Sequence, residues 1–88
     1  MTLTDEQENF LSNLEKQMGI LSSALQKSNI TQEKYDDWYR NVEFKKRVNL
    51  INERSIDFVE NQLLKKINEG DLSAIQFYLK TKGKKRGY

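Results

Sequence analysis

The 88-residue sequence contains no cysteine, no histidine and no proline. The absence of cysteine excludes disulfide bonds and thiolate metal sites. The absence of histidine removes the commonest general base and the commonest zinc ligand. No stretch approaches the roughly 20 apolar residues of a membrane span. The first 15 residues are acidic and lack the apolar run of a signal peptide. These absences predict a soluble protein of a reducing cytoplasm that is not an enzyme and holds no metal or cofactor.

Charge is unevenly distributed between the two halves of the chain. The overall net charge is +2, but residues 1–44 carry eight acidic and four basic side chains, whereas residues 45–88 carry five acidic and eleven basic ones. The halves therefore have net charges of −4 and +6, an asymmetry that indicates contact with nucleic acid. A chain this short forms one small core at best, and such chains often gain further stability by oligomerising.

Glycine is also scarce, and three of the four glycines stand where a predicted helix ends. A first helix begins after Thr4, which forms a capping box with Gln7, and it ends at Gly19. Its apolar side chains recur at helical spacing at Phe10, Leu11, Leu14 and Met18.

Two short helices are predicted next. The first covers about residues 20–27 and stops before Asn29, the residue type other than glycine that best tolerates a left-handed conformation. The second is capped by Thr31. A short helix, a turn of about three residues and a capped helix is the helix-turn-helix pattern, although an ordinary helix pair in a bundle gives the same spacing.

A long helix follows, from Phe44 to Glu69, about 39 Å long at 1.5 Å per residue. One apolar line along it is expected to face the N-terminal helices. A second line lies about a quarter-turn further round and is expected to face the last helix and a neighbouring subunit. Gly70 ends this helix and Asp71 caps the last one. The second line consists of Ile56, Val59, Leu63 and Ile67.

The sequence thus predicts an all-α protein of five helices. Residues 1–43 form a helix-turn-helix three-helix bundle. Residues 44–79 form a long helix and a short helix that fold as an oligomerisation hairpin, and residues 80–88 form a flexible basic tail. The predicted core consists of Phe10, Leu14, Leu21, Leu25, Tyr35, Trp38, Phe44 and Val48.

The third predicted helix would be the recognition helix of a helix-turn-helix. In that role Gln32 and Lys34 would reach base edges in a major groove. The same helix carries Glu33, Asp36 and Asp37, whose charges repel phosphates, and phosphate contacts supply most of the binding energy. Its aromatic residues could stack on exposed bases. Burial in the core is favoured for Tyr35, Trp38 and Tyr39, because they are the largest apolar groups available to a short chain.

The C-terminal tail is the densest basic segment. Its cations predict an arm that follows phosphates without reading sequence, and the alternative is a passive solubilising terminus. The tail's candidate DNA-binding residues are Lys80, Lys82, Lys84, Lys85 and Arg86. Three carboxylates on the long helix, Glu53, Asp57 and Glu60, could in principle hold Mg²⁺. A solvated face is the favoured interpretation, because no second group of ligands converges on them.

The end of the chain also resembles a known family. Gly70-Asp71, followed by Ala74 to Tyr88 (AIQFYLKTKGKKRGY), resembles the terminal signature of phage helix-turn-helix proteins identified as terminase small subunits. The order of the upstream segments also fits this family. Two short helices flank Asn29-Ile30-Thr31, and a long helix that runs to Phe58-Val59-Glu60 follows them. Asn41-Val42 stands where similar members often carry Asp-Pro.

The resemblance implies a non-enzymatic, ring-forming protein in the host cytoplasm. Such a protein binds double-stranded DNA at the packaging-start region and recruits the large ATPase and nuclease subunit. Two alternatives stay open: a phage helix-turn-helix transcriptional regulator, and a structural or interaction protein that does not bind DNA.

Overall fold

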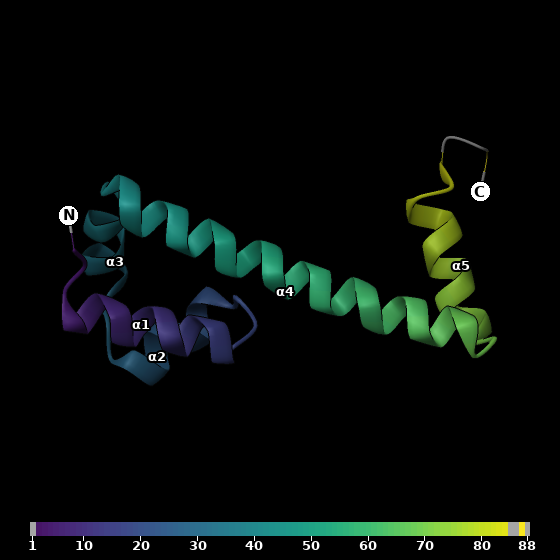
Figure 1. The fold of residues 1–88 in the computed structure, drawn as a ribbon, viewed down its shortest axis with the longest axis horizontal. Helices are drawn as coiled ribbons and strands as arrows, with labels where there is room; N and C mark the ends of the chain where they lie inside the picture. The colour runs from purple at the N-terminus through teal and green to yellow at the C-terminus, as the bar shows by residue number, and fades with distance from the viewer. Residues whose placement is uncertain (1, 85–86, 88) are drawn as a thin grey trace. The chain divides into compact units, whose positions relative to one another are not determined.

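The computed structural model describes residues 2–84 and residue 87 (Figure 1). Over these residues it contains five α-helices and no strand, as predicted. The helices are α1 (Asp5–Lys16), α2 (Leu21–Ser28), α3 (Gln32–Tyr39), α4 (Val42–Asn68) and α5 (Leu72–Thr81). The chain divides within α4 into two compact units, Met1–Ile56 and Asp57–Tyr88, which we call the first and second units.

Three helices begin at the caps that the sequence predicts. The backbone N–H of Gln7 donates to Thr4 Oγ1 at 3.1 Å, and Thr4 N–H donates back to Gln7 Oε1 at 2.9 Å, so the capping box is complete. Thr31 Oγ1 and Asp71 Oδ1 each accept a bond from the N–H three residues further on. A fourth cap was not predicted: Asn41 Oδ1 accepts from Phe44 N–H at 3.0 Å at the start of α4. Each cap satisfies a backbone donor that the helix itself leaves free.

Left-handed residues end three of the helices, and at each end the N–H groups of the left-handed residue and of the residue after it donate back to carbonyls of the helix. After α2 and α4 these residues are Asn29 (φ +56°) and Gly70 (φ +83°), as predicted. After α1 the arrangement differs from the prediction. Met18 (φ +57°) takes the first left-handed position, and Gly19 (φ +77°) follows it. Because α1 ends at Lys16, Met18 does not continue the apolar stripe and is 40% exposed.

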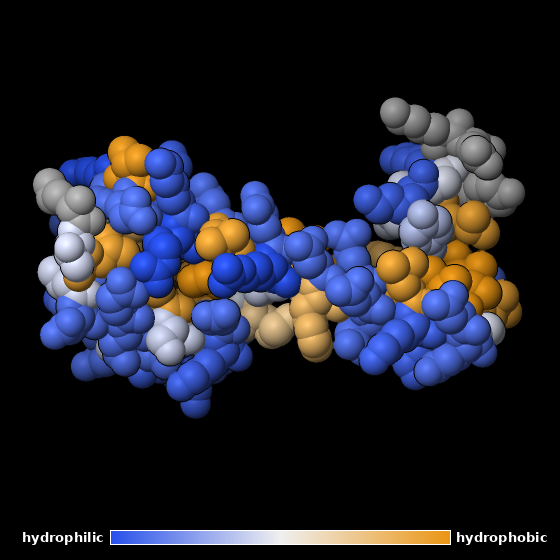
Figure 2. All heavy atoms as spheres, in the orientation of Figure 1, coloured by the Kyte–Doolittle hydropathy of each residue, from blue (hydrophilic) through white to orange (hydrophobic). Residues whose placement is uncertain are grey.

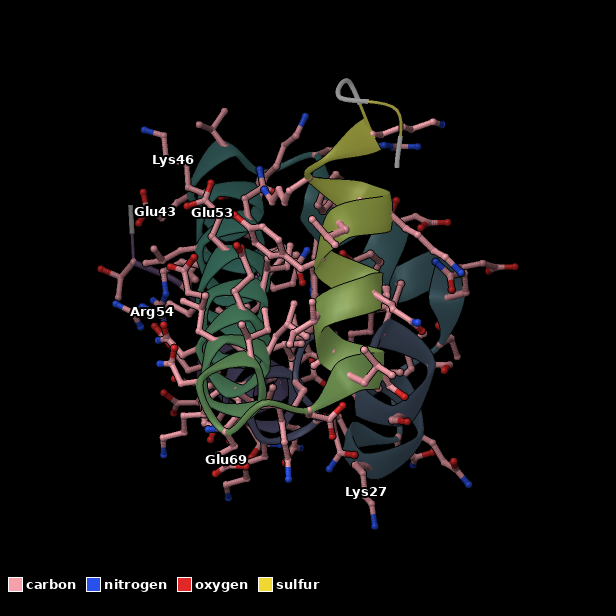
Figure 3. The ribbon with its side chains drawn as sticks, turned by 90° about the vertical axis from the view of Figure 1, so that its right-hand side faces the viewer. Lys27, Glu43, Lys46, Glu53, Arg54 and Glu69 are labelled. Carbon is pink, nitrogen blue, oxygen red and sulfur yellow. The ribbon has the colours of Figure 1, made fainter. Side chains whose placement is uncertain are left out.

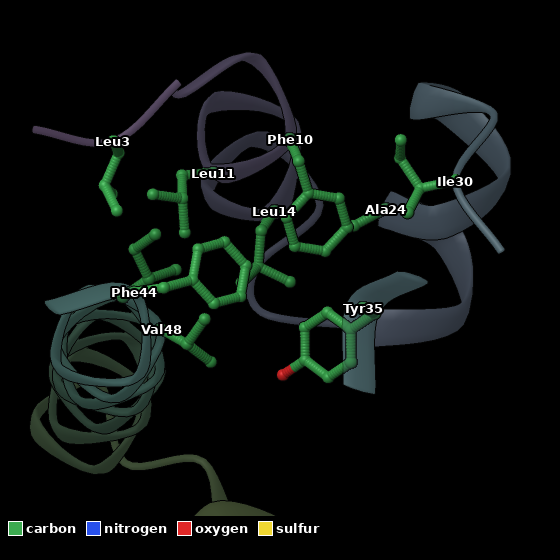
Figure 4. Close-up of a cluster of buried hydrophobic side chains, with 10 residues drawn as sticks. Leu3, Phe10, Leu11, Leu14, Ala24, Ile30, Tyr35, Phe44 and Val48 are labelled. Carbon is green, nitrogen blue, oxygen red and sulfur yellow. The ribbon is translucent and has the colours of Figure 1, made fainter. Parts of the chain in front are cut away.

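The core of the first unit lies where α1 and α3 meet the beginning of α4 (Figure 4). Phe10 and Phe44 are fully buried, with ring centroids 6.0 Å apart, and Trp38 meets Phe44 edge-on at 5.5 Å. Five of the eight predicted core residues are buried. The other three, Leu21, Leu25 and Trp38, are partly buried against them. The core also contains five residues outside the predicted list of eight, namely Leu3, Leu11, Ala24, Ile30 and Ile51.

The N-terminal third of α4 belongs to this core, since Phe44, Val48 and Ile51 are all buried. The first unit therefore extends along α4 as far as Ile56. In the second unit, α5 leaves the end of α4 at the Gly70 joint and turns away from the helix axis (Figure 1). The packing of these helices as a hairpin stays a prediction.

Candidate nucleic-acid interface

Both polar residues predicted to contact DNA from α3 have partners within the chain. Gln32 Nε2 donates to Asp36 Oδ1 at 2.9 Å, one turn further along α3. The ammonium of Lys34 lies 2.7 Å from a carboxylate oxygen of Glu6 on α1 and 5.5 Å from the ring centroid of Trp38. Lys34 is therefore directed toward α1 and the aromatic core.

The remaining exposed charges of α3 are mostly negative. Glu33, Asp36 and Asp37 are exposed. Arg40 lies 3.5 Å from Asp37, with both side chains more than 70% exposed, a geometry that gives little stabilisation. Phosphates approaching α3 would therefore meet a negatively charged face.

The aromatic residues of α3 pack inward, as favoured by the sequence. Tyr35 is buried, with its ring 5.5 Å from Phe10 and 5.9 Å from Phe44. Burial raises the pKa of the Tyr35 hydroxyl, and the neighbouring Tyr39 and Asp36 raise it further. Tyr39 stacks on Tyr35 and also faces the ammonium of Lys45. These contacts leave Tyr35 unavailable as a platform for bases.

The outward surface of α4 in the first unit carries both signs of charge. Figure 3 shows Glu43, Lys46, Glu53 and Arg54 projecting away from the helix, so this surface is a mixed, solvated face. Nowhere in the described part of the chain do three or more carboxylates gather in a way that could hold a metal ion. The three carboxylates considered from the sequence are divided between the units, with Glu53 in the first and both Asp57 and Glu60 in the second.

A groove of about 150 Å³ runs between α1 and α4 in the first unit. At its edge Arg47 donates two hydrogen bonds to the Glu8 carboxylate. Because the Glu8 carboxylate accepts these bonds, it raises the pKa of Arg47 above its ordinary value. The groove is lined by Glu8, Leu11, Ser12, Glu15, Arg47, Leu50, Ile51 and Arg54. With two carboxylates and two guanidinium groups, its rim has no excess of positive charge for phosphates.

The second unit holds the other predicted cations. Lys80 lies in the last turn of α5, Lys82 is its C-cap and Lys84 follows, all three exposed. Positive charge is favourable at a helix C-terminus, because the free carbonyls there carry partial negative charge. Lys85 and Arg86 lie outside the described residues. Among the cations of α4 in this unit, Lys66 lies 3.6 Å from Glu69 and both are well exposed.

The second unit also exposes much of its apolar surface. Ala74 is its only buried residue in the described part of the chain. Apolar side chains gather over the end of α4 and over α5 (Figure 2). Of the predicted interface residues, Leu63 and Ile67 are partly buried, and Ile56 and Val59 are each 58% exposed. Ile56 belongs to the first unit. The exposed large apolar residues of the second unit are Phe58, Val59, Leu64, Leu72, Phe77 and Tyr78.

The predicted site residues therefore fall into separate groups. Gln32 and Lys34 share α3, whereas Lys80, Lys82 and Lys84 follow one another at the end of α5. Sequence reasoning missed the acidic partner of Lys34, because no local pattern relates Glu6 to a residue 28 positions away.

No helix in the described residues combines the length and the apolar character needed to cross a membrane. Comparison with family models, curated proteins and solved structures finds no match to the chain.

Proposed function

We propose that this protein is an oligomeric, non-enzymatic DNA-binding protein of the phage terminase small-subunit type. The observation that carries the proposal is the composition of the second unit, in which exposed apolar side chains and a basic end occur together within about 30 residues. The apolar surface would serve self-association and the basic end would contact phosphates. On this proposal the protein binds double-stranded DNA at the packaging-start region in the host cytoplasm and recruits the large terminase subunit.

The argument for self-association is one of area. Six large apolar side chains of the second unit are 40–67% exposed. If each presents about half of roughly 200 Å², one chain offers on the order of 600 Å² of apolar surface. A typical specific interface buries about 800 Å² on each partner. Soluble monomers rarely expose contiguous apolar patches beyond a few hundred Å². A second copy that covers this surface would account for the single buried residue, Ala74, among the described residues of the second unit.

The argument for phosphate contact is electrostatic. Each cation that neutralises a phosphate releases a condensed counterion, and the entropy of that release is the main source of non-specific affinity. The tail offers five cations within seven residues, whereas α3 offers Lys34 among three exposed carboxylates. The tail therefore supplies most of the affinity, and Gln32 and Lys34 add modest sequence preference. In an oligomer, several weakly binding tails act together and raise the affinity further.

The test is to end the chain after Thr81 and to measure binding to double-stranded DNA over a range of salt concentrations. If the tail makes about four phosphate contacts, the full chain should give a slope of log K against log salt near −3.6, and truncation should bring the slope toward zero. A full-length variant with glutamine at residues 82, 84, 85 and 86 is the matched control, since it keeps the chain length and removes only charge. Unchanged affinity and slope in both variants would show that the tail is a passive terminus.

A transcriptional regulator is the second candidate, favoured by the α2–turn–α3 segment with its left-handed Asn29. Light scattering separates the two, because a ring predicts many subunits and a regulator predicts a dimer. Absence of any salt-dependent DNA binding would instead favour a structural or interaction protein.

A further inference from the structure

The ion pair between Glu6 and Lys34 joins the first turns of α1 and α3. The two groups are 2.7 Å apart, and the Lys34 ammonium also lies near the face of Trp38. The side chains are 45% exposed for Lys34 and 52% for Glu6. A pair this accessible can exchange partners with an anion from solution.

A carboxylate and a phosphate offer the same chemistry to a lysine, namely negatively charged oxygens that accept charge-assisted hydrogen bonds. Lys34 is the only cation between Gln32 and Tyr39. A phosphate that pairs with a cation of α3 must therefore pair with Lys34, and Glu6 competes with it for that ammonium. Displacement also brings the phosphate close to the free Glu6 carboxylate, whose charge repels it.

We propose that Glu6 is an internal competitor for the phosphate contact of Lys34 and thereby holds down the affinity of α3 for nucleic acid. This inference rests on the proposed function, because competition has an effect only if the chain binds DNA. Gln32 is in a similar position. Its side-chain amide, which was predicted to face a base, donates its hydrogen bond to the Asp36 carboxylate instead. Carboxylates of the chain thus occupy both polar groups of α3 that were predicted to contact DNA.

The matched comparison is Glu6→Gln against Asp5→Asn in the full chain. Asp5 lies in the same first turn, is exposed and forms no ion pair within the described part of the chain. Both substitutions remove one negative charge near the N-terminus of α1, so changes in net charge and in helix-dipole interaction cancel between them. Only Glu6→Gln releases Lys34.

Binding to a double-stranded oligonucleotide of random sequence should be about two- to fivefold tighter for Glu6→Gln than for Asp5→Asn at low salt, the range expected from exchange of one exposed ion pair. The salt slope should become steeper by about 0.9, corresponding to one additional phosphate contact. In a Lys34→Gln background, the difference between the two substitutions should disappear.

Equal gains for Glu6→Gln and Asp5→Asn would overturn the role of Glu6 and leave the proposed function intact. A difference that persists in the Lys34→Gln background would also overturn it, because the effect would not act through Lys34. If neither the wild-type chain nor Glu6→Gln binds DNA at any salt concentration, both the inference and the proposed function fail.

Discussion

Arg47 on α4 donates two hydrogen bonds to the carboxylate of Glu8 on α1, at 2.8 and 3.2 Å. This pair joins residues 39 positions apart in the sequence and fixes α1 against the N-terminal part of α4. The side chains are 39% and 46% exposed, so solvent weakens the electrostatic attraction.

We expect a double-mutant cycle of Glu8→Gln and Arg47→Gln to give a coupling of about 0.5–1 kcal/mol in the free energy of unfolding. Arg47→Lys should lose part of it, because lysine cannot donate two parallel bonds to one carboxylate. Urea unfolding followed by circular dichroism measures these values. Arg54→Gln is the control, since Arg54 lines the same groove and has no ion pair in the described structure. An equal coupling between Glu8 and Arg54 would show that the Arg47 geometry has no special effect.

Phe44 and Trp38 differ in how deeply they are buried, although both were predicted in the core. Phe44 is fully buried and Trp38 is only partly buried at the edge of the cluster. Phe44→Ala should therefore cost about 3–5 kcal/mol, whereas Trp38→Ala should cost about 2 kcal/mol, because part of the indole surface already contacts water. Urea unfolding of the two variants checks the order. Equal losses would indicate that the core is centred closer to Trp38 than the structure shows.

Gly19 passes close to α4. A Cβ added at this position would lie 2.7 Å from Asn52 Oδ1, and its φ of +77° disfavours any other residue type. Gly19→Ala should destabilise the first unit by about 1–2 kcal/mol from backbone strain, with only a small further loss from the contact, because the exposed end of the Asn52 side chain can move aside. Asn52→Ala removes the contact. In that background the loss of unfolding free energy caused by Gly19→Ala should fall to the part that comes from backbone strain. If urea unfolding shows the same loss in both backgrounds, the whole effect comes from the left-handed backbone at residue 19.

The helix boundaries could be predicted because they depend on neighbouring residues. Thr4, Thr31 and Asp71 cap helices through N–H groups three residues away, and Asn29 and Gly70 end helices through their own φ values. The prediction that Met18 continues the apolar stripe of α1 was wrong. The helix ends at Lys16, and Met18 itself adopts the left-handed conformation that was expected at Gly19. Asn41 was overlooked as a cap because the boundary was expected nearer to Phe44.

Tertiary contacts could not be predicted in the same way. The pairs Glu6–Lys34 and Glu8–Arg47 depend on how α1 lies against α3 and α4, and periodicity within one helix carries no information about that packing. The same reason explains why the residues of the predicted apolar line on α4 are not equally buried. Helical spacing placed Val59 and Leu63 on one face, but the burial of each depends on α5 and on any neighbouring chain.

Self-association through the second unit predicts different effects for two similar substitutions on one helix. Val59 and Val42 both lie on α4, and they are 58% and 67% exposed. In an isolated chain, glutamate at either position would face water and change little. If a second copy covers Val59, then Val59→Glu places an unpaired charge in the interface, and charges of this kind are strongly destabilising. Light scattering should therefore show a lower mass for Val59→Glu and an unchanged mass for Val42→Glu, with equal helicity by circular dichroism. An unchanged mass for Val59→Glu would remove this part of α4 from the interface and move the search to Leu72 and Phe77 on α5, which are also exposed.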